Sequence, residues 1–195
     1  TKNMAEALFH RGPDDFDQWI DKEKRIAFSF RRLSIIDLTI NGRQPIHSYN
    51  NQYVMVFNGE IFNYKTIKEL IITKTNIKLK GTSDSEILVN SFSVLGIDET
   101  LNLIKGQFSI VLWDKRNEKI HLIRDRMGEK PLYFGFVNND FVFASELKSI
   151  RKHPGFNNKI NFDILNLYFK YLAIPEPYSI YNNIFKLLPG SILSI

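Results

Sequence analysis

The residues best suited to chemistry in this 195-residue chain are Asn58 and Gly59, which follow a strongly apolar run at 53–57. On local evidence alone, an Asn-Gly pair after a strand is typical of a tight hairpin turn. A hairpin needs a second strand at once, however, and residues 60–64 lead into a helical pattern. The sequence therefore predicts a strand that stops at Asn58-Gly59, where an amide side chain and a backbone N–H could together form an oxyanion hole.

Two charged residues, Arg32 and Asp84, could complete a site for a zwitterion. Arg32 precedes a Leu-Ser-Ile-Ile segment, where it is either a surface charge at the start of a strand or a bidentate partner for a carboxylate. Asp84 either caps the helix that begins near Ser85 or binds a ligand, and one residue can do both. Local evidence leaves both pairs of alternatives open.

The chain contains no cysteine, which excludes a disulfide framework, thiolate metal ligands and a thiol nucleophile within these residues. Its histidines never stand at the i, i+4 spacing that places two metal ligands on one helix face, so no metal site is predicted. They are His10, His47, His121 and His153. His121 lies in an apolar strand pattern and is interpreted as a core or edge residue.

Basic side chains gather only in short groups, at Arg31-Arg32 and at 148–152. No nucleic-acid-binding motif surrounds them, so we interpret both groups as solvated surface. The 26 Lys and Arg against 21 Asp and Glu give a net charge of +5, and this excess is spread along the chain. Nucleic acid is therefore not an expected partner.

The length and composition indicate one globular domain, with 44% hydrophobic and 24% charged residues. No stretch approaches the roughly 18 consecutive apolar residues of a membrane span. Residues 1–12 also lack the basic-then-apolar order of a signal peptide. We therefore expect a cytoplasmic protein without a membrane partner. The missing initiator Met and the apolar ending LLPGSILSI predict a fragment of a longer protein.

The elements that must position these residues are mainly antiparallel strands. Residues 108–113 and 119–124 flank a polar DKRNE segment, which predicts a hairpin. Residues 131–137 and 141–144 flank Asn-Asn-Asp, which predicts a second hairpin with a turn suited to left-handed backbone.

Helices are predicted between the strands, at 65–74, 83–95, 98–105 and between Asn161 and Pro175. Ser83 and Glu86 have the spacing of a capping box. The last helix carries an apolar stripe at Ile164, Leu165, Tyr168 and Leu172. Runs of antiparallel strands with helices grouped between them predict a layered α+β sandwich and not a doubly wound sheet.

Seven blocks stand in order along nearly the whole chain. They are His10-Arg-Gly-Pro-Asp-Asp15, Arg32-Leu-Ser-Ile-Ile-Asp37, Gly42-Arg-Gln-Pro45, Phe57-Asn-Gly-Glu-Ile-Phe-Asn-Tyr64, Thr82-Ser-Asp-Ser-Glu86, Arg124-Asp-Arg-Met-Gly-Glu-Lys-Pro-Leu-Tyr133 and Ala144-Ser-Glu-Leu-Lys148. Together they resemble the glutaminase domain of glutamine-hydrolysing asparagine synthetases, a branch of the class II glutamine amidotransferases. This ordered set makes a chance resemblance implausible.

The resemblance implies an N-terminal-nucleophile hydrolase fold, a four-layer αββα sandwich of two mainly antiparallel sheets. It assigns residues 1–195 to one class II glutamine amidotransferase domain that is truncated at its N-terminus. In that family, an N-terminal cysteine attacks the glutamine side-chain amide and gives a thioester and ammonia.

The resemblance also implies a role for each matching residue. The Asn58 side chain and the Gly59 N–H would form the oxyanion hole, and Arg32 would bind the glutamine α-carboxylate. Glu60 and Asp84 would receive the α-ammonium group. Backbone groups of Ile35 and Ile36 would complete the pocket. A zwitterionic amino acid needs such a cation at one end and anions at the other.

This sequence departs from the family in lacking the nucleophilic cysteine. Thr1 is a conceivable substitute, because some N-terminal-nucleophile hydrolases use threonine. We set it aside, since it lies ten residues before Arg11, heads a helix-like segment and lacks a strand that would carry it to the oxyanion hole. Truncation is the simpler explanation, and the fragment alone is predicted to be inactive as a glutaminase.

The resemblance further implies a parent protein that continues into a synthetase domain, which uses ATP and Mg²⁺ to amidate aspartate to asparagine. No cofactor is expected in the present residues. The expected partners are glutamine, the intramolecular synthetase domain and a second subunit in a homodimer. Two alternatives stay open: a related amidotransferase that acts on another carboxyl acceptor, and a non-catalytic relic of the fold.

Overall fold

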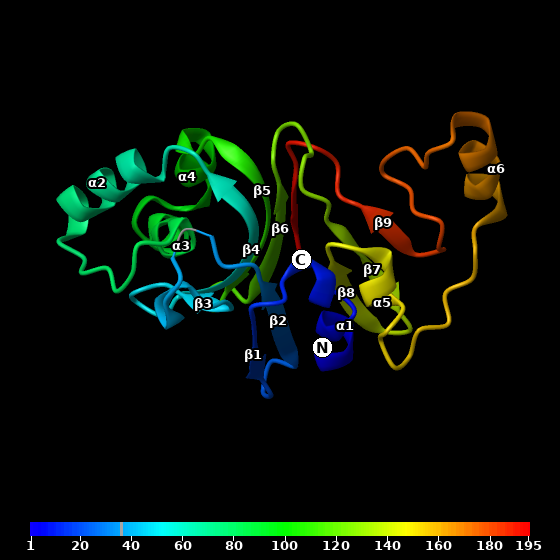
Figure 1. The fold of residues 1–195 in the computed structure, drawn as a ribbon, viewed down its shortest axis with the longest axis horizontal. Coiled ribbons are helices and arrows are strands. Elements are labelled where there is room, and N and C mark those ends of the chain that lie inside the picture. The colour runs from blue at the N-terminus through cyan, green and yellow to red at the C-terminus, as the bar shows by residue number, and fades with distance from the viewer. Residues whose placement is uncertain (36) are drawn as a thin grey trace.

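A computed structural model describes residues 1–35 and 37–195 of the chain, which is built around a five-stranded antiparallel sheet (Figure 1). The strand order is β10-β6-β5-β4-β3. The strands are β3 (Ile46–His47), β4 (Tyr53–Ile61), β5 (Gly106–Asp114), β6 (Lys119–Arg124) and β10 (Ile192–Ser194). The β5–β6 hairpin confirms the prediction made from the segments that flank DKRNE.

A second layer of strands faces this sheet. It contains a three-stranded sheet in the order β8-β7-β9 and a separate hairpin of β1 and β2. The bounds are β1 (Asp15–Asp21), β2 (Ile26–Arg32), β7 (Tyr133–Val137), β8 (Asp140–Ala144) and β9 (Ile184–Lys186). The predicted β7–β8 hairpin is confirmed, and Asn138 in its turn adopts a left-handed backbone with φ of 54°.

The helices lie outside the two strand layers (Figure 1). They are α1 (Lys2–Glu6), α2 (Tyr64–Thr75), α3 (Asp84–Leu95), α4 (Ile97–Leu103), α5 (Leu147–Ile150) and α6 (Phe162–Tyr171), with short 3₁₀ turns at Phe9–Arg11 and Ile40–Gly42. Ser83 caps α3 by accepting from the Glu86 N–H at 3.2 Å. The Asn161 side chain caps α6 in the same way. None of the helices in the described ranges is long and apolar enough to cross a bilayer.

Three apolar cores separate four layers. The first joins α2, α3 and α4 to one face of the five-stranded sheet, with Phe92 and Leu112 among its fully buried residues. The second lies between the two strand layers and contains Phe28 and Val54. The third joins β7, β8 and β9 to α1 and α5. This order of helices, sheet, sheet and helices is the αββα sandwich that the sequence resemblance implied.

One strand prediction is wrong in its end point. Strand β4 does not stop at Asn58-Gly59 but continues to Ile61, with Asn58 opposite Ser109 of β5. The pair is therefore part of the ladder, and the strand-to-helix junction lies four residues later, just before α2. Gly59 has a φ of 154°, and a Cβ at this position would collide with the carbonyl oxygen of Gln107. A close approach between neighbouring backbones requires this glycine.

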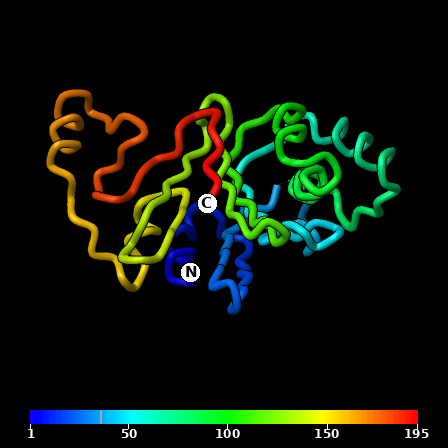
Figure 2. The backbone as a smooth tube through the Cα atoms, turned by 180° about the vertical axis from the view of Figure 1, so that it is seen from behind, coloured from blue at the N-terminus to red at the C-terminus, as the bar shows by residue number. Residues whose placement is uncertain are grey.

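The apolar stripe predicted for the last helix is only partly buried. Ile164 is buried, whereas Tyr168 and Leu172 are 43% and 81% exposed. The helix projects from the body of the molecule, at one extreme of the fold in both views (Figures 1 and 2). Both chain ends, by contrast, lie in the middle of the molecule (Figure 2).

Candidate active site

Asn58 extends a polar side chain from β4 into a cavity between the two strand layers. The cavity has a volume of about 730 Å³ and is lined by β2, β4, β5, β8 and α1. The Asn58 Nδ2 atom is buried and has no hydrogen-bond partner among the described residues. A buried donor without an acceptor costs about 1–3 kcal/mol. Such a donor is therefore suited to an acceptor that a ligand brings into the cavity.

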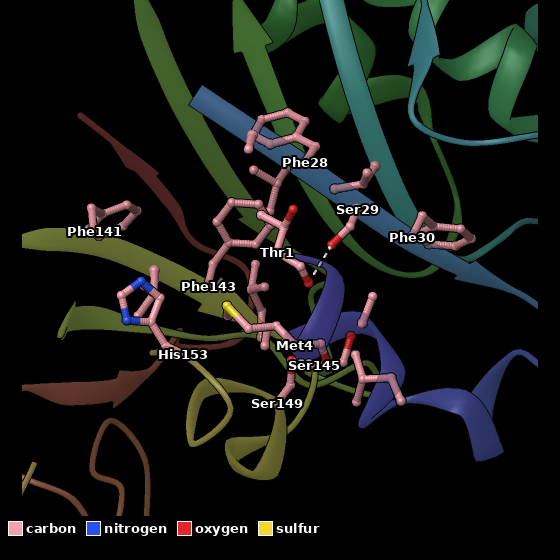
Figure 3. Close-up of a pocket in the computed structure, with 18 of the residues that line it drawn as sticks. Thr1, Met4, Phe28, Ser29, Phe30, Phe141, Phe143, Ser145, Ser149 and His153 are labelled. Carbon is pink, nitrogen blue, oxygen red and sulfur yellow. Dashed lines mark hydrogen bonds between the residues drawn. The ribbon is translucent and has the colours of Figure 1, made fainter. Parts of the chain in front are cut away.

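The remaining cavity wall combines apolar and polar side chains (Figure 3). Phe28 of β2 and Phe143 of β8 both come from the second strand layer, and Met4 comes from α1. Thr1 also lines the cavity and caps α1, and its carbonyl oxygen accepts from the Ser29 hydroxyl at 3.4 Å. The predicted helical setting of Thr1 is confirmed.

The Gly59 N–H is directed toward the edge of β4 that faces the loops around the site. The Phe57 N–H donates to Gln44 Oε1 at 2.6 Å, and the Ile61 N–H donates to Asp84 Oδ2 at 3.0 Å. Alternate residues of an antiparallel strand direct their N–H groups to the same edge. The Gly59 N–H therefore lies between these two bonded groups, at an edge that β3 covers only near the beginning of β4.

Arg32 lies at the end of β2 and is 9% exposed. Its guanidinium donates to two backbone carbonyls, from Nη1 to Thr39 O at 2.9 Å and from Nη2 to Asp37 O. None of the ion pairs among the described residues includes Arg32. A buried guanidinium with neutral partners keeps its positive charge available for an anion. The surface interpretation of Arg32 is wrong.

Asp84 brings negative charge to the end of β4. It is the first residue of α3, is 7% exposed and accepts from the Ile61 N–H. Burial raises the pKa of Asp84 above its usual value, and the charge of nearby Glu60 acts in the same direction. Glu60 itself is exposed at the end of the same strand. Both carboxyl groups therefore lie near the end of β4, where they could bind a cation.

The sequence resemblance predicts that backbone groups of Ile35 and Ile36 contribute to the pocket. Ile35 is 75% exposed in the loop after β2, and Ile36 lies outside the described residues. The structure thus brings Glu60 and Asp84 to one end of β4, beside Asn58 and Gly59. Arg32 is held by the neighbouring loop.

Three further residues hold these elements together, and the sequence patterns gave no role to any of them. Gln44 binds both backbone groups of Phe57, accepting from its N–H and donating from Nε2 to its carbonyl at 3.0 Å. The Asp37 carboxylate accepts from the N–H groups of Thr39 and Thr82. Asp37, Gln44 and Thr82 all stand inside the blocks that carried the family resemblance, which was the only signal for them.

The candidate site residues supply charged and uncharged hydrogen-bonding groups. No group of three or more potential metal ligands occurs in the part of the chain that the structure describes. The sequence supplies no cysteine. What the residues do offer is a guanidinium, two carboxyl groups and two uncharged N–H donors, which suits a small zwitterion that carries a carbonyl group.

The fold is shared with a solved structure of an amidotransferase. The chain matches the glutamine phosphoribosylpyrophosphate amidotransferase from B. subtilis, complexed with ADP and GMP, with a TM-score of 0.60 and 20% identity over 88% of this chain and 33% of that one. Together with the αββα layering, this likeness defines an N-terminal-nucleophile hydrolase fold.

The family follows from sequence. The profile described as "Glutamine amidotransferase domain" matches residues 1–195, and the chain therefore belongs to this family. It is 42% identical over 161 residues to the glutamine-hydrolyzing asparagine synthetase 2 of Bacillus subtilis (strain 168), covering 83% of this chain and 21% of that protein. Synthetase 1 of the same organism is 34% identical over 194 residues, which cover 100% of this chain and 30% of that protein. The chain thus spans less than a third of the length of either relative.

Proposed function

We propose that this domain hydrolyses the side-chain amide of glutamine and supplies ammonia to a synthetase domain of the same polypeptide, which amidates aspartate to asparagine. The observation that carries the proposal is the Asn58 Nδ2 donor, which is buried, has no partner among the described residues and lines a cavity. An oxyanion that forms there would satisfy it. The names of the relatives support glutamine as the nitrogen source.

The roles proposed for these residues give glutamine a defined orientation. Its α-carboxylate would pair with the Arg32 guanidinium, and its α-ammonium would lie between Glu60 and Asp84. Backbone groups of Ile35 and Ile36 would complete the glutamine pocket. The side-chain amide would then extend along β4 toward Asn58 and Gly59. Charged groups fix the head of the substrate, and uncharged donors meet its carbonyl oxygen.

The reaction needs a nucleophile from outside these 195 residues, and a cysteine at a free N-terminus is the proposed one. Its α-amine would accept the thiol proton, and the sulfur would attack the amide carbon. The Asn58 amide and the Gly59 N–H would stabilise the negative oxygen of the tetrahedral intermediate. Collapse of the intermediate breaks the C–N bond, and the proton passes to the departing nitrogen, which leaves as ammonia. Water then hydrolyses the thioester to glutamate.

The rest of the proposal concerns the longer protein. We assign residues 1–195 to one class II glutamine amidotransferase domain, and ATP and Mg²⁺ would bind in the synthetase domain and not in this chain. A homodimer and a cytoplasmic location, where ATP is available, belong to the same proposal.

The full-length protein, incubated with glutamine, aspartate, ATP and Mg²⁺, tests the function. We expect glutamate and asparagine to form together, and N-terminal sequencing to show a free cysteine. Glutamate without asparagine would indicate another ammonia acceptor. Asparagine formed from ammonium salts but not from glutamine would identify this domain as a relic and contradict the proposal.

A further inference from the structure

Asp37 is a buried carboxylate in the loop that follows β2, and the proposed reaction gives it no role so far. The residue is 4% exposed. Its Oδ1 atom accepts from the Thr39 N–H at 2.8 Å and from the Thr39 hydroxyl at 2.6 Å. Its Oδ2 atom accepts from the Thr82 N–H at 2.9 Å and from the Thr82 hydroxyl at 3.4 Å. One carboxylate therefore joins two segments that are 45 residues apart in sequence.

The first of these segments holds Arg32. The carbonyl oxygen of Asp37 accepts from Arg32 Nη2, and the carbonyl oxygen of Thr39 accepts from Arg32 Nη1. By accepting from Thr39, the Asp37 carboxylate holds residues 37–39 in a turn. In this turn, the carbonyls of Asp37 and Thr39 both face the Arg32 guanidinium. Movement of Asp37 would thus displace both acceptors that fix Arg32.

The second segment carries Asp84. Thr82 stands two residues before Asp84, immediately ahead of the Ser83 cap of α3. Gly81 permits the close approach, because a Cβ there would lie 2.6 Å from Asp37 Oδ2. A second contact supports the same junction, since Asn41 Nδ2 donates to Lys80 O at 3.0 Å. The loop after β2 is therefore attached directly to the start of α3.

We infer that Asp37 is a positioning residue for glutamine, which fixes the distance between the carboxylate-binding Arg32 and the ammonium-binding Asp84. The inference rests on the proposed function. It explains how two ends of one α-amino acid could be recognised by residues from different segments. Recognition of the α-carboxylate and α-ammonium groups would depend on the contact between Asp37 and Thr82 as much as on Arg32 and Asp84.

The charge of Asp37 suits this role. The Thr39 hydroxyl and the Thr82 N–H hold the pKa of Asp37 at about 2, so the group is ionised at neutral pH. A carboxylate offers only acceptors and can bind donors on both sides. An asparagine would present an NH₂ group to one of the two segments, where it would face N–H donors. Because Asp37 forms no ion pair with Arg32 among the described residues, it holds the guanidinium without neutralising it.

The Asp37→Asn variant of the full-length protein tests the inference through steady-state kinetics of glutamate formation. We expect the KM for glutamine to rise about 10- to 100-fold, as misplacement by about 1 Å predicts, with kcat changed much less. Asparagine formation from ammonium salts is expected to stay unchanged. In an Arg32→Ala background, Asp37→Asn is expected to raise KM by less than about twofold, because the guanidinium that Asp37 positions is already absent.

Asp114→Asn is the matched control. Asp114 is also buried, at 1% exposed, and also accepts backbone N–H groups, from Arg116 at 2.9 Å and Asn117 at 3.2 Å, but it is the last residue of β5, next to the β5–β6 turn. We expect this control to leave the KM for glutamine unchanged. An equal rise in KM for the control and for Asp37→Asn would show a general effect on folding and overturn the inference.

A second variant covers the case in which Asp37→Asn does not fold. Thr39 and Thr82 are both exposed, so the double variant Thr39→Val/Thr82→Val removes two hydroxyl donors to Asp37 and leaves the N–H donors in place. A KM for glutamine raised severalfold supports the inference, and an unchanged KM overturns it. If the unaltered protein releases no glutamate from glutamine, the proposed function fails and the inference fails with it. Glutamate release with full additivity of Asp37→Asn and Arg32→Ala overturns the inference alone.

Discussion

Gly42 packs against the Arg32 guanidinium. Replacing Gly42 with alanine therefore perturbs the proposed substrate site without removing any side chain that would bind glutamine. A Cβ at this position would lie 2.8 Å from Arg32 Cζ, whereas ordinary contact begins at 3.4 Å. The guanidinium centre must therefore move by about 0.6 Å (3.4 − 2.8 Å), and Nη2, which lies closer still, must move further. Such a shift breaks the geometry of both bonds to the carbonyls of Asp37 and Thr39.

Displacement of a substrate-positioning group by about 1 Å costs about 100-fold in activity. We therefore expect Gly42→Ala to reduce kcat/KM for glutamine by about 10- to 100-fold, mainly through KM. Ammonia-dependent synthesis by the full-length protein is expected to be retained, since Arg32 has no part in it. Steady-state kinetics with glutamine and with ammonium salts as nitrogen donors measure both values.

Gly155→Ala is the control for this variant. A Cβ there also meets the end of a side chain, Asn138 Nδ2 at 2.6 Å, but that side chain is exposed and lies in the β7–β8 turn. We expect the control to keep its KM for glutamine. A folded Gly42→Ala protein with an unchanged KM would refute the assignment of Arg32 to the α-carboxylate.

Three further predictions concern pH and stability. Because burial raises the pKa of Asp84, acidification should raise the KM for glutamine at a pH above the ordinary aspartate value of 3.8, and pH-dependent kinetics measure this. The pKa of Asp37 at about 2 contributes stability that is complete above about pH 4 and lost as the pH falls toward 2, which acid unfolding followed by circular dichroism can detect. Arg124→Met should lower the free energy of unfolding by at least about 3 kcal/mol, since it leaves buried carbonyls without their donor and removes one of the two cations that pair with Glu176. Urea denaturation tests that value, and a loss below about 1 kcal/mol would contradict it.

Local patterns were sufficient to predict strand β4 apart from its end point, and two of the hairpins. The β5–β6 and β7–β8 hairpins combine β-branched and aromatic runs with polar turns, and both form as predicted. The β1–β2 hairpin and the short strands β9 and β10 were not predicted. Strand β1 has no buried residue, and β9 and β10 contain only three residues each. Such strands are defined by their partners and not by their own composition.

In the candidate site, too, the sequence predicted the residue types but not the contacts between distant segments. The sequence blocks pointed to Arg32, Asn58 and Asp84, but left open whether Arg32 and Asp84 served only as a surface charge and a helix cap. Burial of both residues followed only from the packing of distant segments. The role of Asp37 was hidden in the same way, because its donor Thr82 lies 45 residues away. Spacing along a chain does not reveal contacts over such separations.

The strand continuing through Asn58-Gly59 shows why a favoured local interpretation can fail. An Asn-Gly pair favours a turn when its neighbours allow one. Here both residues pair with β5, and Gly59 accommodates the close approach of Gln107. The requirement for glycine at position 59 follows from the neighbouring backbone of Gln107 and not from a turn.

The most direct test of the proposed function is the Asn58→Ala variant of the full-length protein, assayed with glutamine and with ammonium salts. Removal of one oxyanion donor is expected to reduce glutamine-dependent turnover by about 10²- to 10³-fold. Ammonia-dependent asparagine formation is expected to remain unchanged. An equal loss with both nitrogen donors, or unchanged turnover with glutamine, would contradict the role of the buried Asn58 amide on which the proposed function depends.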